Sequence, residues 1–163
     1  SSNKLREVWR NKPLLLHVVE AALTSRCDAV RVVVGHDADA VRALLPEGVR
    51  SVYARHHATG LSASLRAGIA SVDDDMLVLL GDMPLVEAAH LDAMIDALGD
   101  LPVVATADGA AGNPVLWPAA YKPRFAALEG DAGAKALLAD GYDTVEIGEA
   151  AGRDFDVPEA FTA

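Results

Sequence analysis

The sequence predicts an α/β fold in which a mostly parallel sheet carries helices on both faces. The first observation behind this prediction is that short apolar or β-branched runs alternate along the chain with longer segments of helical periodicity. The second is the run MLVLL at 76–80, which is apolar throughout and is followed by Gly81, Asp82 and Pro84. An evenly apolar run bounded by turn residues is typical of an inner parallel strand buried on both faces.

Several segments have helical character. The first is expected over 13–25, because Pro13 suits the first turn of a helix and the apolar residues after it keep a 3.6-residue period. The segment 87–98 shows the same period in its apolar residues. Further helices are expected where such segments follow loops, at 38–45, 61–71, 119–128 and 133–140.

Strands are expected between these helices. β-Branched residues predict one strand at 30–34, and a short run of the same kind predicts another at 49–54. After the central strand at 76–80, the remaining strands are expected at 102–106, 114–117 and 144–147. The glycines at 108–112 indicate a flexible turn, and the polar residues 1–10 are expected to be irregular.

Three loops that contain glycine or acidic residues follow predicted strands, at 35–37, 56–60 and 81–82. Because each would join a strand to a helix, we expect all three at one edge of the sheet, where open α/β sheets bind their ligands. Asp82 in the last of these loops is the strongest candidate for a functional residue. Taken alone, however, this stretch favours the simpler interpretation that Asp82 caps the helix that begins near Glu87.

Length and composition limit the possible functions. The chain has 163 residues, which suits one domain. Its formal net charge of −10 repels a phosphate backbone, so a nucleic-acid partner is not expected. No apolar run is long enough for a membrane helix and residues 1–10 lack the layout of a signal peptide, so we expect a cytoplasmic protein without a membrane partner.

Metal binding through cysteine or histidine is not expected either. Cys27 is the single cysteine, and the five histidines are scattered without a pair at metal-ligand spacing. Carboxylates are better candidates, because Asp82 together with Asp154 or Asp156 could hold Mg²⁺ through oxygen ligands. Ser62 and Ser64 lie near the start of a predicted helix, where they could contact an anion or a base, or simply cap the helix.

A series of motifs runs along nearly the whole chain. In chain order they are NKL at 3–5, KPLL at 12–15, GHD at 35–37, GLSASLRAG at 60–68, GDMP at 81–84, GNPVL at 112–116, GDAGA at 130–134 and DFDVPE at 154–159. Each is common by itself, but their order is specific. Together they resemble the molybdenum cofactor nucleotidyltransferases, a family of MobA-like NTP transferases, and within it the cytidylyltransferase branch.

The resemblance implies a three-layer, Rossmann-like fold of the nucleotide-diphospho-sugar transferase type, with Mg²⁺ as cofactor. It further implies that a nucleoside triphosphate, with CTP favoured, donates its nucleotidyl group to a molybdopterin-type acceptor and releases pyrophosphate. A client molybdoenzyme is a possible further partner. Two other functions stay open: a guanylyl- or sugar-phosphate nucleotidyltransferase of the same fold, and a non-catalytic chaperone that binds the molybdenum cofactor.

Site residues follow from the matching motif positions. Lys4 and Asp82 are implied to be catalytic, and Asp82 and Asp156 to bind the metal, with Asp154 as an alternative to Asp156. Asn113 and Pro114 are implied to lie near the molybdopterin-type substrate. The residues implied to contact the nucleotide are Lys4, Gly60, Ser62, Ser64, Gly81 and Asp82.

The chain departs from the family pattern in two places. Family members begin with a strand and a glycine-rich loop immediately before the lysine, whereas this sequence begins Ser1-Ser2-Asn3-Lys4. We therefore expect that the single nucleotidyltransferase domain, residues 1–163, lacks its N-terminal strand and loop in this sequence. In addition, Asn113 stands where many relatives have histidine.

Overall fold

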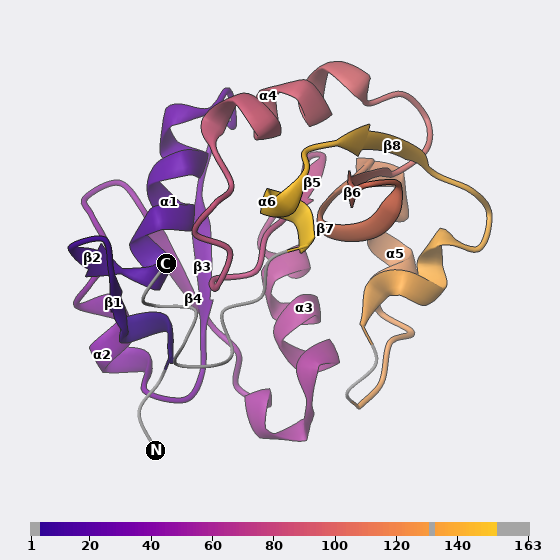
Figure 1. Cartoon of the computed structure of the whole chain (residues 1–163). Coiled ribbons are helices and arrows are strands. Elements are labelled where there is room, and N and C mark those ends of the chain that lie inside the picture. Colours follow the sequence, from indigo (N-terminus) through magenta and orange to yellow (C-terminus); the bar gives the residue numbers. More distant parts are fainter. Residues whose placement is uncertain (1–3, 131–132, 153–163) are drawn as a thin grey trace.

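The strands of this protein lie among helices (Figure 1), and in the described residues they form one four-stranded sheet and two two-stranded sheets. The computed structural model describes residues 4–130 and 133–152, and all structural statements concern these ranges. The strands are β1 (Val8–Trp9), β2 (Lys12–Pro13), β3 (Arg31–Val34), β4 (Arg50–Tyr53), β5 (Met76–Val78), β6 (Val103–Ala107), β7 (Ala110–Trp117) and β8 (Asp143–Glu146).

Helices connect these strands in the order that the sequence predicts. The α-helices are α1 (Leu14–Thr24), α2 (Ala38–Arg42), α3 (Leu61–Ala70), α4 (Ala88–Ala97), α5 (Lys122–Phe125) and α6 (Glu149–Gly152). Short 3₁₀ helices are η1 (Lys4–Arg6), η2 (His57–Thr59), η3 (Ala119–Tyr121) and η4 (Ala134–Leu138). The segments predicted as helices at 119–128 and 133–140 are therefore shorter and partly 3₁₀. None of the helices in the described ranges is long and apolar enough to cross a membrane.

The strand pairing is mixed. β3 and β4 are parallel, and β5, β7, β6 and β8 form a second sheet in that order. In this second sheet β7 is antiparallel to both β5 and β6, whereas β6 and β8 are parallel. The α/β class is thus confirmed, while parallel pairing extends less far than the sequence suggests. Within the described residues, no ladder joins β3 to β5.

A two-residue turn causes the antiparallel pairing. Asp108 and Gly109 connect β6 to β7 with φ angles of 50° and 81°, the left-handed conformation that a tight hairpin requires. The prediction of a flexible turn over 108–112 is therefore wrong, because β7 already starts at Ala110. Gly112 and Asn113 consequently belong to a strand.

A second small hairpin occupies the segment that was expected to be irregular. β1 pairs with β2 across Arg10 and Asn11, which have φ angles of 49° and 69°. Trp9 is buried there, and the His17 imidazole forms a 2.6 Å hydrogen bond with the Trp9 carbonyl oxygen. The apolar contact of this indole with Leu14 orders the start of the chain against α1.

Both faces of the four-stranded sheet are buried, as the sequence predicts. On one face Val104 and Val115 pack with Trp117 and with Phe125 of α5. On the other face the neighbouring residues Val103 and Leu116 pack against Met94 of α4. Helices therefore cover the sheet on both sides, which produces three layers.

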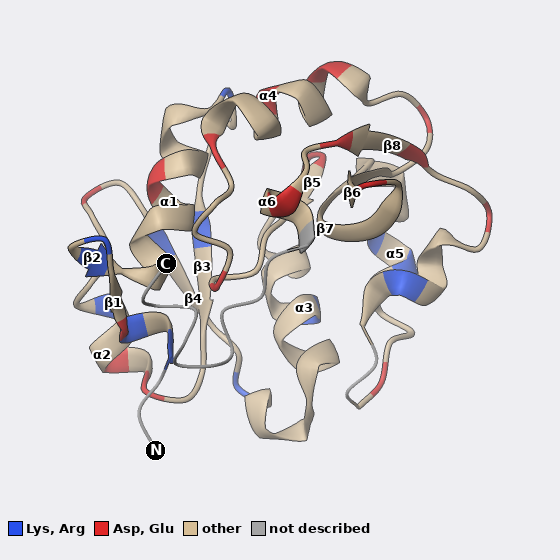
Figure 2. Ribbon diagram, in the orientation of Figure 1, with Lys and Arg blue, Asp and Glu red and all other residues tan. Residues whose placement is uncertain are grey.

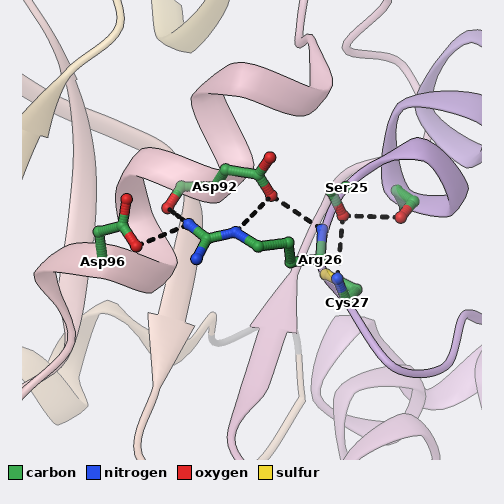
Figure 3. Close-up of polar contacts among 6 residues, drawn as sticks. Ser25, Arg26, Cys27, Asp92 and Asp96 are labelled. Atoms are coloured by element: carbon green, nitrogen blue, oxygen red, sulfur yellow. Dashed lines mark hydrogen bonds and ion pairs between the residues drawn. The ribbon is translucent and has the colours of Figure 1, made fainter.

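A charged contact joins the end of α1 to α4 (Figure 3). The Arg26 backbone N–H donates to Asp92 Oδ1 at 2.8 Å, and Arg26 Nη2 donates to Asp96 Oδ1 at 2.6 Å. The hydrogen bond to Asp96 and the charge of this carboxylate raise the pKa of Arg26 above its ordinary value. The Arg26 guanidinium, which is always charged in proteins, thus links the end of α1 to two carboxylates of α4.

Candidate functional site

The strongest candidate pair, Lys4 and Asp82, is in contact. Asp82 lies in the segment that follows β5, and Lys4 is the first residue of η1. Lys4 Nζ and Asp82 Oδ2 are 2.6 Å apart. The Asp82 side chain is 14% exposed and that of Lys4 43% exposed, so both can be reached from solvent. Folding thus brings together two residues that are far apart in the sequence, beyond the carboxyl end of β5. In the described pairing β5 is an edge strand with β7 as its antiparallel neighbour, so the sequence-based prediction of an inner parallel strand is wrong for these residues.

Gly81 makes this contact possible. A Cβ atom at residue 81 would lie 2.8 Å from Leu5 Cδ2 and 3.3 Å from Leu15 Cδ1. Such distances are too short for ordinary packing, so the absence of a side chain lets η1 approach the end of β5. Lys4 is placed beside Asp82 by this approach, which gives Gly81 a role in shaping the site.

The charge around Lys4 differs from that of the molecule as a whole. The basic residues Lys4, Arg6, Arg10 and Lys12 lie within residues 4–12, which contain one acidic residue, Glu7. Figure 2 shows basic segments in blue around β1 and β2. Acidic residues instead dominate α4, β8 and the surrounding loops (Figure 2). In a chain with a net charge of −10, this segment provides a local positive potential beside Asp82, which suits an anionic ligand.

The loops after the first two parallel strands lie against each other. A Cβ atom on Gly35, which follows β3, would be 2.6 Å from Cγ of His57, which follows β4. Val34, the last residue of β3, belongs to one apolar cluster with Leu15, and Leu15 also approaches Gly81. The three loops predicted to share one edge of the sheet therefore surround a common group of side chains.

The start of α3 is built around Gly60 and Ser62. Gly60 precedes the helix with φ 120°, a conformation that disfavours residues with a side chain. Ser62 is 1% exposed, and its hydroxyl donates to the Gly130 carbonyl oxygen at 2.7 Å. Ser64, two residues further along α3, is partly buried. The Ser62 hydroxyl thus holds the 130 loop against α3, and contact of either serine with a base stays a prediction.

Asn113 and Pro114 lie level with the segment that carries Asp82. β5 and β7 are paired with Val78 opposite Val115, so the preceding residues of β7 come beside the chain just beyond β5. Asn113 is partly buried, Pro114 is buried, and the peptide bond between them is cis. Asn113 and Pro114 therefore lie on the side of the Val78–Val115 pair toward which β5 leads into the Asp82 segment.

The metal site that the sequence predicts falls only in part within the described residues. Asp154 and Asp156 lie outside the described residues, and residues 4–130 with 133–152 contain no group of three or more acidic, histidine or cysteine residues that could hold a metal. Asp82 by itself fits such a role. Its carboxylate is partly exposed and has a side-chain ammonium as partner, and Mg²⁺ is typically bound through one or two carboxylates together with phosphate oxygens.

Sequence reasoning missed Glu146, the last residue of β8. Its carboxylate accepts hydrogen bonds from the Asp108, Gly109 and Gly148 backbone N–H groups and from the Thr106 hydroxyl. The bonds from Gly109 and Asp108 contribute most to holding the pKa of Glu146 below its ordinary value. The glutamate therefore fastens the turn of the β6–β7 hairpin to the end of β8.

Comparison with known proteins gives a family and a fold. Residues 1–146 match the family described as MobA-like NTP transferase domain. Over 87 residues the chain is 36% identical to the bifunctional protein GlmU of Pseudothermotoga lettingae. This region is 53% of the chain but 19% of that protein, so the match spans less than a fifth of the relative's length.

Similar solved structures include Rv0371c from Mycobacterium tuberculosis. The TM-score is 0.84 at 23% identity, over 99% of this chain and 88% of that one. A complex of Rv0371c with manganese gives 0.80 at 23% identity, over 99% and 91%. Molybdopterin-guanine dinucleotide biosynthesis protein A from Archaeoglobus fulgidus gives 0.71 at 13% identity, over 98% and 87%. These similarities confirm the Rossmann-like α/β fold.

Proposed function

The chain belongs to the family of MobA-like NTP transferase domains, and from this premise we propose that it transfers the cytidylyl group of CTP to a molybdopterin-type cofactor. The observation that carries the proposal is the 2.6 Å pair of Lys4 and Asp82, which lies beyond the carboxyl end of β5, the strand that pairs with the Asn113-bearing β7. This arrangement offers a cation for phosphate and a carboxylate for a metal. The GLSASLRAG segment at 60–68, which resembles the cytidylyl branch, supports the choice of CTP.

The reaction is a phosphoryl-type displacement. A phosphate oxygen of the acceptor forms a bond to the α-phosphorus of the nucleotide while the bond from the α-phosphorus to the bridging oxygen of the β-phosphate breaks. Pyrophosphate leaves with the bonding electron pair. Such reactions depend on positioning and on charge stabilisation more than on covalent catalysis by protein, so no protein nucleophile is required.

Lys4 is assigned to the triphosphate. Its ammonium is 43% exposed and lies on a flexible side chain, so it can turn from Asp82 toward a bound phosphate. There it would offset negative charge on the transferred group and on the pyrophosphate. Two exposed basic residues nearby, Arg6 of η1 and Arg10 of the turn between β1 and β2, would favour the approach of the anionic substrate.

Asp82 and Asp156 are assigned to a divalent cation, with Mg²⁺ expected. The cation would neutralise charge that develops on the α-phosphate and the leaving group. Crystals of Rv0371c with manganese support a divalent metal for this fold. On the acceptor side, Asn113 and Pro114 are assigned to the molybdopterin-type substrate, because the pairing of β5 with β7 brings them level with the Asp82 segment.

A pyrophosphate-release screen tests the proposal. The protein is incubated with each of the four common nucleoside triphosphates and Mg²⁺, with and without molybdenum-loaded molybdopterin. We expect release that depends on the acceptor and is fastest with CTP. Absence of release with every nucleotide, together with binding of the cofactor, would contradict the enzyme and indicate a cofactor-binding chaperone.

Guanine nucleotide is the second candidate donor. The observation in its favour is the fold similarity to the Archaeoglobus fulgidus protein, whose name refers to molybdopterin-guanine dinucleotide. Thermal unfolding separates the two candidates, because a ligand that binds the native state raises Tm according to its affinity. We expect CTP with Mg²⁺ to raise Tm more than GTP at equal concentration, and the opposite order would assign the donor to guanine.

A further inference from the structure

The segment 128–130 lies across the first turns of α3 and is attached there by two residues of the helix. The Ser62 hydroxyl and the Ser62 backbone N–H both donate to the Gly130 carbonyl oxygen, at 2.7 and 3.0 Å. One turn further along α3, Arg66 Nη1 donates to the Leu128 carbonyl oxygen. Three donors of the helix are therefore bonded to two carbonyl groups of one short segment.

The spacing of these contacts matches one turn of helix to a stretch of extended chain. Ser62 and Arg66 are four residues apart on α3, so they lie on one face of the helix and about 6 Å apart along its axis. Leu128 and Gly130 are two residues apart, a distance that an extended chain covers in about 7 Å. Because Ser62 bonds the later of these residues and Arg66 the earlier one, the segment runs antiparallel to α3. Both attachments can therefore form at the same time.

The Arg66 guanidinium has no carboxylate partner within residues 4–130 and 133–152, although the chain has a net charge of −10. Arg26, Arg42 and Arg124, in contrast, each pair with an aspartate. The partly buried Arg66 side chain instead bonds a main-chain carbonyl, a group that moves only when the chain moves. A charged donor also strengthens the hydrogen bond. This arginine therefore holds the chain at Leu128 and takes no part in a surface ion pair.

The first turn of α3 lies at the same end of the sheet as Asp82. A short turn joins α3 to β5, and Ile69 near the end of the helix belongs to one apolar cluster with Met76 at the start of the strand. Leu65 and Val78 pack against the same cluster, so helix and strand run side by side in opposite directions. The ten residues of α3 span about 15 Å, and the chain from Met76 to Asp82 spans at most about 20 Å. The attached segment therefore borders the edge at which the nucleotide is proposed to bind.

We propose that Arg66 and Ser62 are positioning residues, which hold the segment 128–130 as a fixed border of the nucleotide site and do not contact the nucleotide themselves. This inference rests on the proposed function. Ser62 is 1% exposed, and both its hydroxyl and its N–H are already bonded to Gly130. A nucleotide could take these donors only by displacing the segment. The two residues therefore act on the nucleotide through the position of the segment.

Hydrogen–deuterium exchange of Arg66→Met tests the attachment. Methionine keeps much of the side-chain length but has no group that can donate to the Leu128 carbonyl. The Ser62 amide is the reporter, because its N–H donates to the Gly130 carbonyl. We expect this amide to exchange roughly three- to tenfold faster in Arg66→Met than in the unaltered protein. Arg66→Lys retains a charged donor and should recover most of the protection.

Initial rates with CTP and Mg²⁺, or with GTP if guanine is the donor, report the effect on the nucleotide site. For Arg66→Met we expect KM for the nucleotide to rise about fivefold while kcat changes less than about twofold, because a border of the site is displaced and the reacting groups are not. Arg66→Lys should again recover most of the loss. Ser62→Ala should raise KM less, about twofold, because the backbone N–H at this position still bonds Gly130 and the lost hydroxyl bond is uncharged.

Arg50→Met is the matched control. Arg50 is exposed at the start of β4, the opposite end of that strand from the loop that leads to α3. Its side chain makes no hydrogen bond or ion pair within the described residues. The substitution removes the same charge as Arg66→Met, so neither the exchange of the Ser62 amide nor KM should change.

The outcomes separate this inference from the proposed function. Faster exchange with unchanged KM in Arg66→Met would overturn the positioning role and leave the proposed function intact, and so would unchanged exchange of the Ser62 amide. A larger rise in KM for Ser62→Ala than for Arg66→Met would identify the serine as a direct nucleotide contact and would also overturn it. If the unaltered protein releases pyrophosphate from no nucleotide, the proposed function fails, and the positioning role fails with it.

Discussion

Asp82 lies in the segment after β5 and Glu146 is the last residue of β8, yet the two carboxylates have different partners. Asp82 faces the ammonium of Lys4, on a side chain that is 43% exposed. Glu146 faces three backbone N–H groups and one hydroxyl. Backbone donors cannot turn away without moving the chain, whereas a lysine side chain can exchange one anion for another. The type of partner therefore distinguishes the two carboxylates: Asp82 can bind a ligand in place of Lys4, whereas Glu146 stabilises the fold.

The largest effect is expected for Asp82→Asn. The amide keeps the shape of the side chain but loses the charge, so kcat/KM should fall by roughly 10² or more, equivalent to about 2.7 kcal/mol of transition-state stabilisation. Tm without ligand should stay nearly constant, because a partly exposed ion pair contributes little to stability. A variant with lower Tm and unchanged turnover would give Asp82 the structural role that we assign to Glu146.

A double-mutant cycle adds Asp156→Asn. If both carboxylates hold one metal, either substitution removes most of the same function, and the double variant should be little worse than the single ones. Mg²⁺-dependent turnover and thermal unfolding are measured for all four proteins. Additive losses in turnover, or full activity of Asp156→Asn, would reject the shared metal site.

Gly112→Ala should produce the largest effect on the structural side of the comparison. The new methyl group would meet the Ala151 carbonyl oxygen, and such overpacking costs about 1–3 kcal/mol of unfolding free energy. Gly99→Ala is the control, because a Cβ atom at Gly99 has nothing within 4 Å. Denaturant unfolding should show the loss in the first variant alone, and equal stability of the two would indicate that α6 moves without cost.

Lys4→Met should have a smaller effect than Asp82→Asn. The methionine keeps most of the side-chain length but removes the charge, so we expect KM for the nucleotide to rise about tenfold, since one charge-assisted contact to phosphate is lost. Initial rates measured over a range of nucleotide concentrations give this value. A decrease in kcat with unchanged KM would instead mean that Lys4 acts in the transition state alone.

The smallest effect is the pH dependence of the Glu146 attachment. Because the folded-state pKa lies below the ordinary value of 4.5, the stabilisation is fully present above that pH and is lost as the pH falls through the folded-state pKa. The difference in Tm between the unaltered protein and Glu146→Gln should therefore be constant at neutral pH and shrink in acid. A difference that grows below pH 4.5 would contradict the direction of the shift.

Local sequence patterns predicted a role for Asp82 but none for Glu146. Asp82 was found because it directly follows an apolar strand, and this arrangement is visible within a few residues of sequence. Glu146 could not be found in this way. Its partner Thr106 is 40 positions away, and the two meet only because β6 and β8 pair in parallel. Side-chain contacts that depend on pairing between distant strands leave little trace in local sequence.

For the β6–β7 hairpin, the sequence did contain a turn signal, but it was interpreted only as a flexible turn. Asp108-Gly109 between two apolar runs is a typical hairpin sequence, and it predicts antiparallel strands where a flexible turn was expected. The hairpin of β1 and β2 had no comparable signal, because Trp9 is its single buried residue and the strands are two residues long.

The two-residue connection between β6 and β7 also has a kinetic consequence. Closing so short a loop costs little chain entropy, whereas the parallel pairs β3–β4 and β6–β8 require the ends of much longer segments to meet. Contacts that are local in sequence form fastest, so we expect the β6–β7 hairpin to be an early folding unit. Each strand carries apolar residues for both helical layers, and the remaining elements can then assemble on this template.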